Sequence, residues 1–80
     1  MAKTVTIYST PWCVYCHAAK EFFNEHKVAY QDKDVQADQV ALQEMVQKSG
    51  QMGVPVIDID GSLIVGFDRP RLTELLGIKS

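Results

Sequence analysis

Two cysteines separated by two residues, Cys13 and Cys16, are the side chains best suited to chemistry in this sequence. They follow a strand-like stretch over residues 4–8 and open a helix-like stretch, so both thiols should lie at the start of one helix, one turn apart. A disulfide that closes so short a loop stabilises a fold by only about 2 kcal/mol, against about 3 kcal/mol for a loop of about 15 residues. The pair is therefore better placed to exchange disulfides than to hold the chain together.

The two thiols are predicted to have different tasks. Cys13 lies at the exposed tip of the helix, where unpaired backbone amides and the positive end of the helix dipole favour a thiolate. Cys16 shares the apolar face of the helix with Ala19 and Phe23. We therefore expect Cys13 to attack a substrate disulfide as the nucleophile and Cys16 to resolve the mixed disulfide, which leaves a Cys13–Cys16 redox disulfide.

Two other interpretations of the cysteines are open on the sequence alone. They could be unreactive residues of a core helix, or they could bind zinc together with His17 and His26. The spacing argues against zinc, because His17 follows Cys16 directly and points about 100° away around a helix, and zinc-finger histidines come later as a spaced pair. We expect no metal site and ordinary surface positions for both histidines.

The elements that position the thiols can be predicted from hydrophobic periodicity and from turn residues. Strands are expected over residues 4–8, 28–35, 54–59 and 63–65, and helices over residues 14–26, 37–49 and 71–76. The second strand is polar and should lie at a sheet edge. A strand-helix-strand unit forms a parallel pair, and the later hairpin adds antiparallel strands. The sequence therefore predicts an α/β fold of order βαβ-α-ββα, with a mixed four-stranded sheet flanked by three helices.

Size and charge exclude several classes of function. The chain has 80 residues, 46% of them hydrophobic, and a formal net charge of −2. This length fits one domain over residues 1–80. The charge provides no basic field for nucleic acid or an anionic membrane, and no segment resembles a transmembrane helix or a signal peptide. We therefore expect a cytoplasmic protein, in a compartment where paired thiols are usually catalytic or metal-binding rather than structural.

Four motifs follow one another along nearly the whole chain: Trp-Cys-Val-Tyr-Cys at residues 12–16, Lys20 on the same helix, Gly-Val-Pro at residues 53–55 and Val-Gly-Phe-Asp at residues 65–68. Together they resemble the glutaredoxins. The likeness is especially close to small glutaredoxin-like redoxins that carry the run found here at residues 49–61. It implies a thioredoxin fold in which the proline of the third motif, Pro55, has a cis peptide bond and lies against the dithiol.

The resemblance also implies a set of glutathione- or substrate-binding residues: Tyr15, Val54, Pro55, Gly66, Phe67 and Asp68. The backbone of Val54 would pair with glutathione or a peptide like an added strand. Tyr15 would border the glutathione groove, the alternative being an ordinary packing aromatic. Residues 66–68 would hold the γ-glutamyl end of glutathione at a helix N-terminus, and Asp68 has the alternative of simply capping that helix.

The sequence departs from the glutaredoxin pattern at four positions. Val14 replaces the usual proline and Gly53 the usual threonine. Val65 replaces the usual glycine, and Arg69 stands where an acidic residue is usual. Phe67 followed by Arg69 and Pro70 is also similar to the Gly-Phe-Arg-Pro segment of redoxins that serve ribonucleotide reductase, with Asp68 interrupting the match. Those redoxins are recharged by thioredoxin reductase.

Three further residues have two interpretations each. Trp12 would form a contact surface, as in thioredoxin, or would shield the strand-helix turn. Lys20 would lend positive potential to the thiolate or, as we favour, would lie in solvent as an ordinary helix lysine. Asp58 interrupts an apolar strand, and we interpret it as a solvated residue at the hairpin end rather than as a proton relay.

Together these features predict a thiol-disulfide oxidoreductase that reduces protein disulfides or glutathione mixed disulfides. Glutathione is expected as a co-substrate, no cofactor is expected to bind tightly, and the protein should be a monomer. One alternative is a redoxin that is recharged by thioredoxin reductase and supplies electrons to ribonucleotide reductase. Another is a carrier in which Cys13 and glutathione from two subunits hold an iron–sulfur cluster, which Cys16 disfavours because it competes by forming a disulfide.

Overall fold

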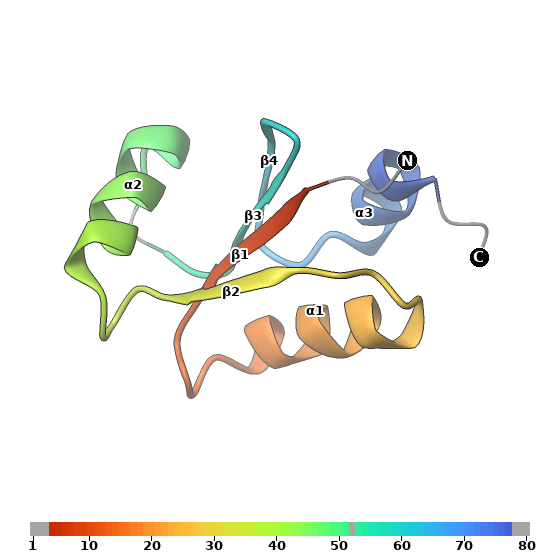
Figure 1. The fold of residues 1–80 in the computed structure, drawn as a ribbon, viewed down its shortest axis with the longest axis horizontal. Coiled ribbons are helices and arrows are strands. Elements are labelled where there is room, and N and C mark those ends of the chain that lie inside the picture. The colour runs from red at the N-terminus through yellow and green to blue at the C-terminus, as the bar shows by residue number, and fades with distance from the viewer. Residues whose placement is uncertain (1–3, 52, 78–80) are drawn as a thin grey trace.

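The computed structural model describes residues 4–51 and 53–77 of the chain. Within these residues the elements follow the predicted order: β1 (Val5–Ser9), α1 (Val14–Glu25), β2 (Gln31–Asp34), α2 (Gln39–Ser49), β3 (Val56–Ile59), β4 (Ser62–Val65) and α3 (Arg69–Leu76) (Figure 1). The α/β fold predicted from the sequence is confirmed by this order.

One mixed sheet joins the strands in the order β2-β1-β3-β4, so the polar strand β2 lies at an edge, as predicted. β1 runs parallel to β2 and antiparallel to β3, which pairs in turn antiparallel with β4. The register places Tyr8 opposite Val56, and Val56 opposite Val65. One end of the sheet therefore brings together the end of β1, the start of β3 and the end of β4. The loops that carry the predicted site residues are attached to the strands at this end.

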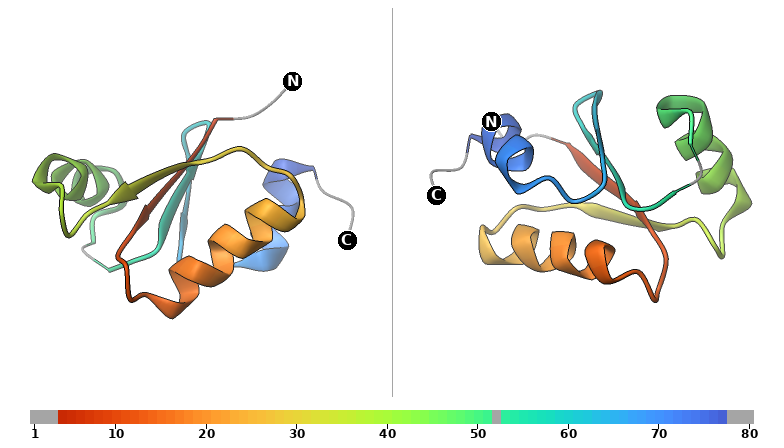
Figure 2. Two further views of the ribbon diagram at one scale, coloured as in Figure 1. Left: turned by 60° about the horizontal axis from the view of Figure 1, so that its bottom comes forward. Right: turned by 180° about the vertical axis from the view of Figure 1, so that it is seen from behind.

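Helices cover both faces of this sheet (Figure 2). α1 and α3 pack on one face, where Phe23 and Leu72 share a buried cluster with Ile7 of β1. α2 packs on the other face, where Met45 shares a second buried cluster with Tyr8 of β1. Successive strand residues point to opposite faces, which is why two neighbours in β1 belong to different clusters. The helix that carries both cysteines is thus held against the sheet by aromatic and aliphatic packing.

The second strand is shorter than the sequence suggested. A strand over residues 28–35 was expected, but β2 begins only at Gln31. Lys27 has a left-handed φ of 55°, and the amide of Val28 donates to the carbonyl of Phe23 at 2.8 Å. These two features turn the chain back against the end of α1, so it reaches the sheet a few residues later than the periodicity predicted.

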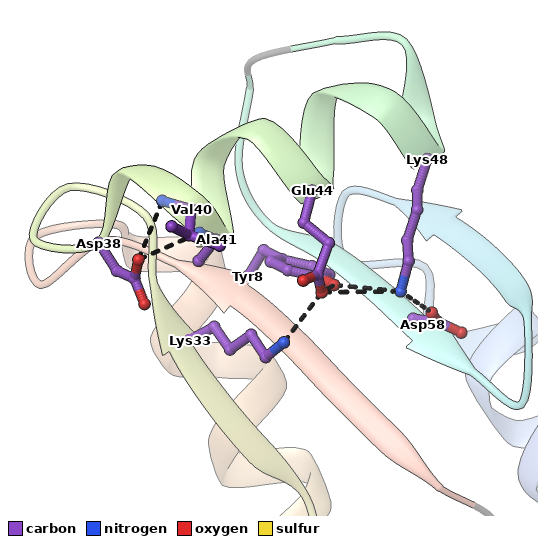
Figure 3. Close-up of polar contacts among 8 residues, drawn as sticks. All are labelled: Tyr8, Lys33, Asp38, Val40, Ala41, Glu44, Lys48 and Asp58. Atoms are coloured by element: carbon purple, nitrogen blue, oxygen red, sulfur yellow. Dashed lines mark hydrogen bonds and ion pairs between the residues drawn. The ribbon is translucent and has the colours of Figure 1, made fainter.

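Capping residues set the starts of the second and third helices. Asp38 accepts two backbone amides of the first turn of α2, so this helix begins at Gln39 rather than at residue 37 (Figure 3). Asp68 caps α3 by accepting the amide of Arg71, and this helix begins at Arg69, earlier than predicted. Pro70 is accommodated because amides in the first helical turn have no partner within the helix.

A polar network ties α2 to the sheet (Figure 3). Tyr8 is fully buried and donates its hydroxyl to Oε1 of Glu44 at 2.5 Å. Lys33 of β2 pairs with the same oxygen at 2.9 Å. Lys48 of α2 donates to the Tyr8 hydroxyl at 3.3 Å and pairs with Asp58 of β3 at 2.9 Å. The hydrogen bonds from Tyr8 and Lys33 favour the carboxylate and lower the pKa of Glu44 to about 2.

The lowered pKa of Glu44 predicts a loss of stability in acid. Because the folded-state pKa of about 2 lies below the ordinary value of 4.5, the carboxylate stabilises the fold above pH 4.5 and this contribution is lost as the pH falls toward 2. Glu44→Gln should therefore show a shallower fall in Tm over this range than the wild type, measured by circular dichroism at a series of pH values. Glu21→Gln, exposed on α1, is the control and should follow the wild type. An equally steep decline in Glu44→Gln would contradict the prediction.

Candidate active site

Cys13 occupies the N-cap position of α1, directly after the turn that follows β1. Its backbone is extended (φ −82°, ψ 114°), and its Sγ accepts a hydrogen bond from the amide of Cys16 at 3.1 Å. The amide of Cys13 donates to the carbonyl of Thr10 at 3.3 Å, which closes the turn. Helix amides and the helix dipole favour the thiolate form of a sulfur held in this position. The side chain is partly exposed, so the sulfur is open to a disulfide in solution.

Cys16 lies one turn further along α1 and is fully buried. Burial raises its pKa to about 12, and the hydrogen bond with Cys13 adds to the rise. Cys16 therefore remains a protonated thiol at neutral pH. Both cysteines are free thiols in this structure. The arrangement provides one accessible sulfur and one sheltered sulfur on consecutive turns of the same helix.

Large apolar side chains around Cys13 point into solvent. Trp12 is 72% exposed, Val14 76% and Tyr15 67%. This exposure argues against both packing interpretations, because Tyr15 is not an ordinary core aromatic and Trp12 does not shield the turn. Exposed apolar side chains beside an accessible sulfur form a surface that a substrate can cover.

The Val54–Pro55 peptide bond is cis, as the family resemblance predicted. The register of β3 with β1 brings this segment to the end of the sheet where the dithiol lies. Pro55 is buried, and its carbonyl accepts the amide of Gly66 at 2.8 Å. The backbone of Val54 forms no hydrogen bond with any residue in the described part of the chain. Its amide and carbonyl are therefore available to pair with an extended peptide.

The three residues after β4, residues 66–68, each have a different structural role. Gly66 has a φ of 87°, a left-handed conformation that favours glycine. Phe67 is half-buried and packs edge to face on Phe22, with ring centroids 6.1 Å apart. Asp68 accepts the amide of Arg71 at 3.3 Å. The capping interpretation of Asp68 is confirmed, while the role of this segment toward glutathione stays a prediction.

His26 and Arg69 both lie against the ring of Phe22. The centroids of the His26 and Phe22 rings are 4.5 Å apart, and the Arg69 guanidinium lies 5.6 Å from the Phe22 centroid. Arg69, which replaces the usual acidic residue, thus forms a cation–π contact between α1 and α3. Within residues 4–51 and 53–77, no group of three or more metal-binding side chains occurs.

Two charged residues are less solvated than the sequence indicated. Lys20 pairs with Asp32 of β2 at 2.7 Å, and only 18% of its side chain is exposed. The Asp58 side chain is 15% exposed and pairs with Lys48 at 2.9 Å. The expectation of solvated side chains is wrong for both, because each is covered by a partner on another element. Asp58 faces α2, the opposite side of the sheet from Cys16, so the geometry does not support a proton relay to the dithiol.

His17 has a contact that the sequence interpretation missed. Its Nε2 lies 2.6 Å from the carbonyl oxygen of Pro11. A carbonyl can only accept a hydrogen bond, so Nε2 carries the proton and donates. The bond joins the first turn of α1 to the turn that presents Cys13. The sequence feature that could have indicated this contact is the four-residue spacing between Cys13 and His17. It places both residues on the same side of the start of α1.

Loss of the hydrogen bond between His17 and Pro11 should slow the alkylation of Cys13. A single intramolecular hydrogen bond contributes about 1 kcal/mol, so His17→Phe should lower the alkylation rate of Cys13 by up to about fivefold, because the turn holds the sulfur over the Cys16 amide less of the time. Iodoacetamide kinetics at neutral pH, followed by mass spectrometry, measures this rate. His17→Gln can still donate and should recover part of it. Equal rates in all three proteins would show that the bond does not position Cys13.

Comparisons with known proteins agree with this geometry. The Glutaredoxin family model matches residues 5–64. A glutaredoxin-like 8.6 kDa protein in the rubredoxin operon of Clostridium pasteurianum is 40% identical over 72 residues, 90% of this chain and 96% of the relative. The glutaredoxin-like protein NrdH of Lactococcus lactis is 31% identical over 71 residues, 89% of this chain and 97% of the relative. The crystal structure of the thioredoxin-like protein BC3987 matches with a TM-score of 0.86 and 32% identity, covering 91% of this chain and 100% of that one.

The fold, the helix-capping dithiol and the cis proline define a glutaredoxin-like redox protein with a thioredoxin fold. The chain belongs to the glutaredoxin family, which comprises thiol-disulfide oxidoreductases. No helix in the described part of the chain has the length and hydropathy needed to cross a membrane.

Proposed function

We propose that this protein is a thiol-disulfide oxidoreductase that reduces protein disulfides or glutathione mixed disulfides. One observation carries the proposal: Sγ of Cys13 lies 3.1 Å from the amide of Cys16, and Cys16 is buried one turn behind it. The amide stabilises the attacking thiolate, and the buried thiol is protected from reacting first. The accessible sulfur captures the substrate and the sheltered sulfur releases it.

The reaction transfers two electrons from the dithiol to the substrate. The Cys13 thiolate attacks one sulfur of the substrate disulfide, a mixed disulfide forms, and the other substrate sulfur leaves as a thiolate. Cys16 then loses its proton and attacks Sγ of Cys13. The Cys13–Cys16 bond forms, the mixed disulfide breaks, and the second substrate sulfur leaves and takes up a proton.

We assign substrate binding to the surface around Cys13. The main chain of Val54, which has no hydrogen-bond partner among residues 4–51 and 53–77, pairs with the extended backbone of glutathione or of a peptide beside the buried Pro55. Tyr15 borders the groove with its exposed ring. Residues 66–68, at the N-terminus of α3, bind a substrate carboxylate.

Glutathione is a co-substrate in this proposal. No tightly bound cofactor is required, because both electrons are stored on the two thiols. We further propose that the protein acts as a monomer in the cytoplasm, where the thiol pool keeps a dithiol reduced between turnovers.

A second electron donor, thioredoxin reductase, is favoured by specific observations. The chain is 31% identical to a glutaredoxin-like protein NrdH, and the exposed Trp12 beside Cys13 is similar to the tryptophan of thioredoxin. Asp68 is also engaged in capping α3, which leaves one less acceptor for glutathione. In this alternative the protein would supply electrons to ribonucleotide reductase.

A direct assay separates the two donors. The oxidised protein is offered either reduced glutathione or NADPH with thioredoxin reductase, and free thiols are titrated over time. The donor that restores two thiols per chain within minutes identifies the route. Cys16→Ser, which cannot form the internal disulfide, is the control. Failure to obtain a Cys13–Cys16 disulfide with any oxidant would refute the proposed function itself, whichever donor is used.

A further inference from the structure

A hydrogen-bonded group of three side chains, Ser9, Asp32 and Lys20, is not used in the proposed reaction; Ser9 is buried, whereas 42% of the Asp32 side chain is exposed. Ser9, at the end of β1, is 1% exposed and donates its hydroxyl to Oδ1 of Asp32 at 2.7 Å. The other oxygen of Asp32 pairs with Nζ of Lys20 at 2.7 Å. The Lys20 side chain is only 18% exposed. Both oxygens of the carboxylate are therefore engaged, and the ammonium group is held in one place between α1 and β2.

Lys20 brings this group close to Cys16. Lys20 follows Cys16 by one helical turn, so the two side chains lie on the same side of α1. Ser9 directly precedes Thr10, whose backbone lowers the pKa of Cys16. Burial raises the pKa of Cys16, and the nearby charge of Lys20 opposes this rise. Cys16 is thus approached by Lys20 from its own helix and by the end of β1, with Asp32 of β2 holding the ammonium.

The second step of the exchange reaction, in which Cys16 attacks Sγ of Cys13, is favoured by a positive charge near Cys16. Cys16 must become a thiolate to attack Sγ of Cys13, but it is fully buried, and a buried thiolate is strongly disfavoured. An ammonium one turn away compensates part of that cost. Negative charge on Cys13 opposes ionisation of Cys16, and that charge is absent once Cys13 has formed the mixed disulfide. The resolving step is therefore where a fixed cation has the largest effect.

We propose that Lys20 is a positioning residue for the resolving step, and that Ser9 and Asp32 set its place and strength. Lys20 favours the Cys16 thiolate, while Asp32 fixes the ammonium and partly neutralises it. The inference rests on the proposed function and adds residues to the second of its two steps. The other charged network, Tyr8, Glu44 and Lys48, ties α2 to the face of the sheet opposite α1.

The two steps can be timed separately with a chromogenic aromatic disulfide that releases a nitrothiobenzoate anion at each exchange. Reduced protein is mixed with the disulfide in a stopped-flow instrument. Attack by Cys13 releases the first anion, and attack by Cys16 on the mixed disulfide releases the second. Because nitrothiobenzoate is a good leaving group, the rate of the second phase reports the thiolate fraction of Cys16.

Opposite effects are expected from the two members of the ion pair. Lys20→Gln should slow the second phase about tenfold and shift its pH profile upward, because the cation is lost. Asp32→Asn keeps a hydrogen-bond acceptor but removes the negative charge, so the second phase should become faster and its pH profile should shift downward. The first phase should change by less than about twofold in either variant. Lys20→Arg keeps the charge and should restore most of the rate.

Lys33→Gln is the matched control, because Lys33 is the neighbour of Asp32 but pairs with Glu44 on the opposite face of the sheet. It breaks an ion pair of β2 without touching Cys16, and both phases should match the wild type. If Lys20→Gln and Asp32→Asn slow the second phase alike, the ion pair only stabilises the packing of α1 on β2, and the inference is overturned. An unchanged second phase in Lys20→Gln overturns it as well. If the wild type shows no second phase, the proposed function fails instead.

Discussion

Replacement of Cys13 by serine is expected to lower the rate of disulfide reduction by at least about a thousandfold. The wild-type sulfur accepts the amide of Cys16 at 3.1 Å and is partly exposed, so it is held at the start of α1 and accessible to a substrate. A serine hydroxyl stays protonated at neutral pH and cannot form a disulfide with a substrate. Turnover of a protein disulfide and of a glutathione mixed disulfide, each with an excess of reductant, measures the loss.

Cys16→Ser is the matched control for this prediction because it removes a thiol but keeps the nucleophile. It should form a mixed disulfide that persists and can be detected by mass spectrometry, since no second thiol resolves it. Protein disulfide reduction should be lost, while glutathione itself can still resolve a glutathione mixed disulfide. Unchanged reductase activity in Cys13→Ser would refute the assignment of the nucleophile.

Phe23→Ala is expected to lower the free energy of unfolding by about 3–5 kcal/mol. Phe23 is fully buried, and its ring lies 5.3 Å from that of Tyr30 and 6.1 Å from that of Phe22, measured between centroids. Truncation removes these contacts and leaves a cavity between α1 and the sheet. A protein of 80 residues has a total stability of about 4–12 kcal/mol, so this single change removes a large part of it. Urea titration of the reduced protein measures the difference.

Val40→Ala provides the comparison for Phe23→Ala. Val40 lies in the first turn of α2 and is 70% exposed. Truncation at an exposed site creates no cavity, so the free energy of unfolding should stay within about 0.5 kcal/mol of the wild type. A loss below about 1 kcal/mol in Phe23→Ala would mean that α1 is not packed on the sheet as described.

Local signals in the sequence were sufficient for the dithiol and for most of the elements. The amides at the start of a helix have no intrahelical partner in any fold, so the position of Cys13 at a strand-helix junction predicted its capping role. The alternation over residues 4–8 predicted a strand there, although the structure covers both of its faces. Each of these signals depends only on residues within one turn or one strand, which is why it could be read without the fold.

The family resemblance predicted features that local signals could not. The cis bond before Pro55 has no local signature, since only about 5–6% of such bonds are cis. The approach of Gly66 to Pro55, whose carbonyl it contacts at 2.8 Å, depends on the register of β3 with β4. The cis bond was reached through a motif shared with other glutaredoxins, whereas the contact between Gly66 and Pro55 was supplied by the structure.

The charged side chains show what only the tertiary structure decided. Lys20 and Asp58 were expected in solvent, yet each pairs with a residue on another element at 2.7 Å or 2.9 Å. Such pairs depend on which strands are neighbours, on their register and on which face each helix covers. The sequence by itself determined that two thiols stand at the start of a helix, because helix amides act within one turn. Only the tertiary structure decided that Lys20 is fixed by Asp32, because Asp32 reaches it from a strand that the crossover of the chain places next to β1.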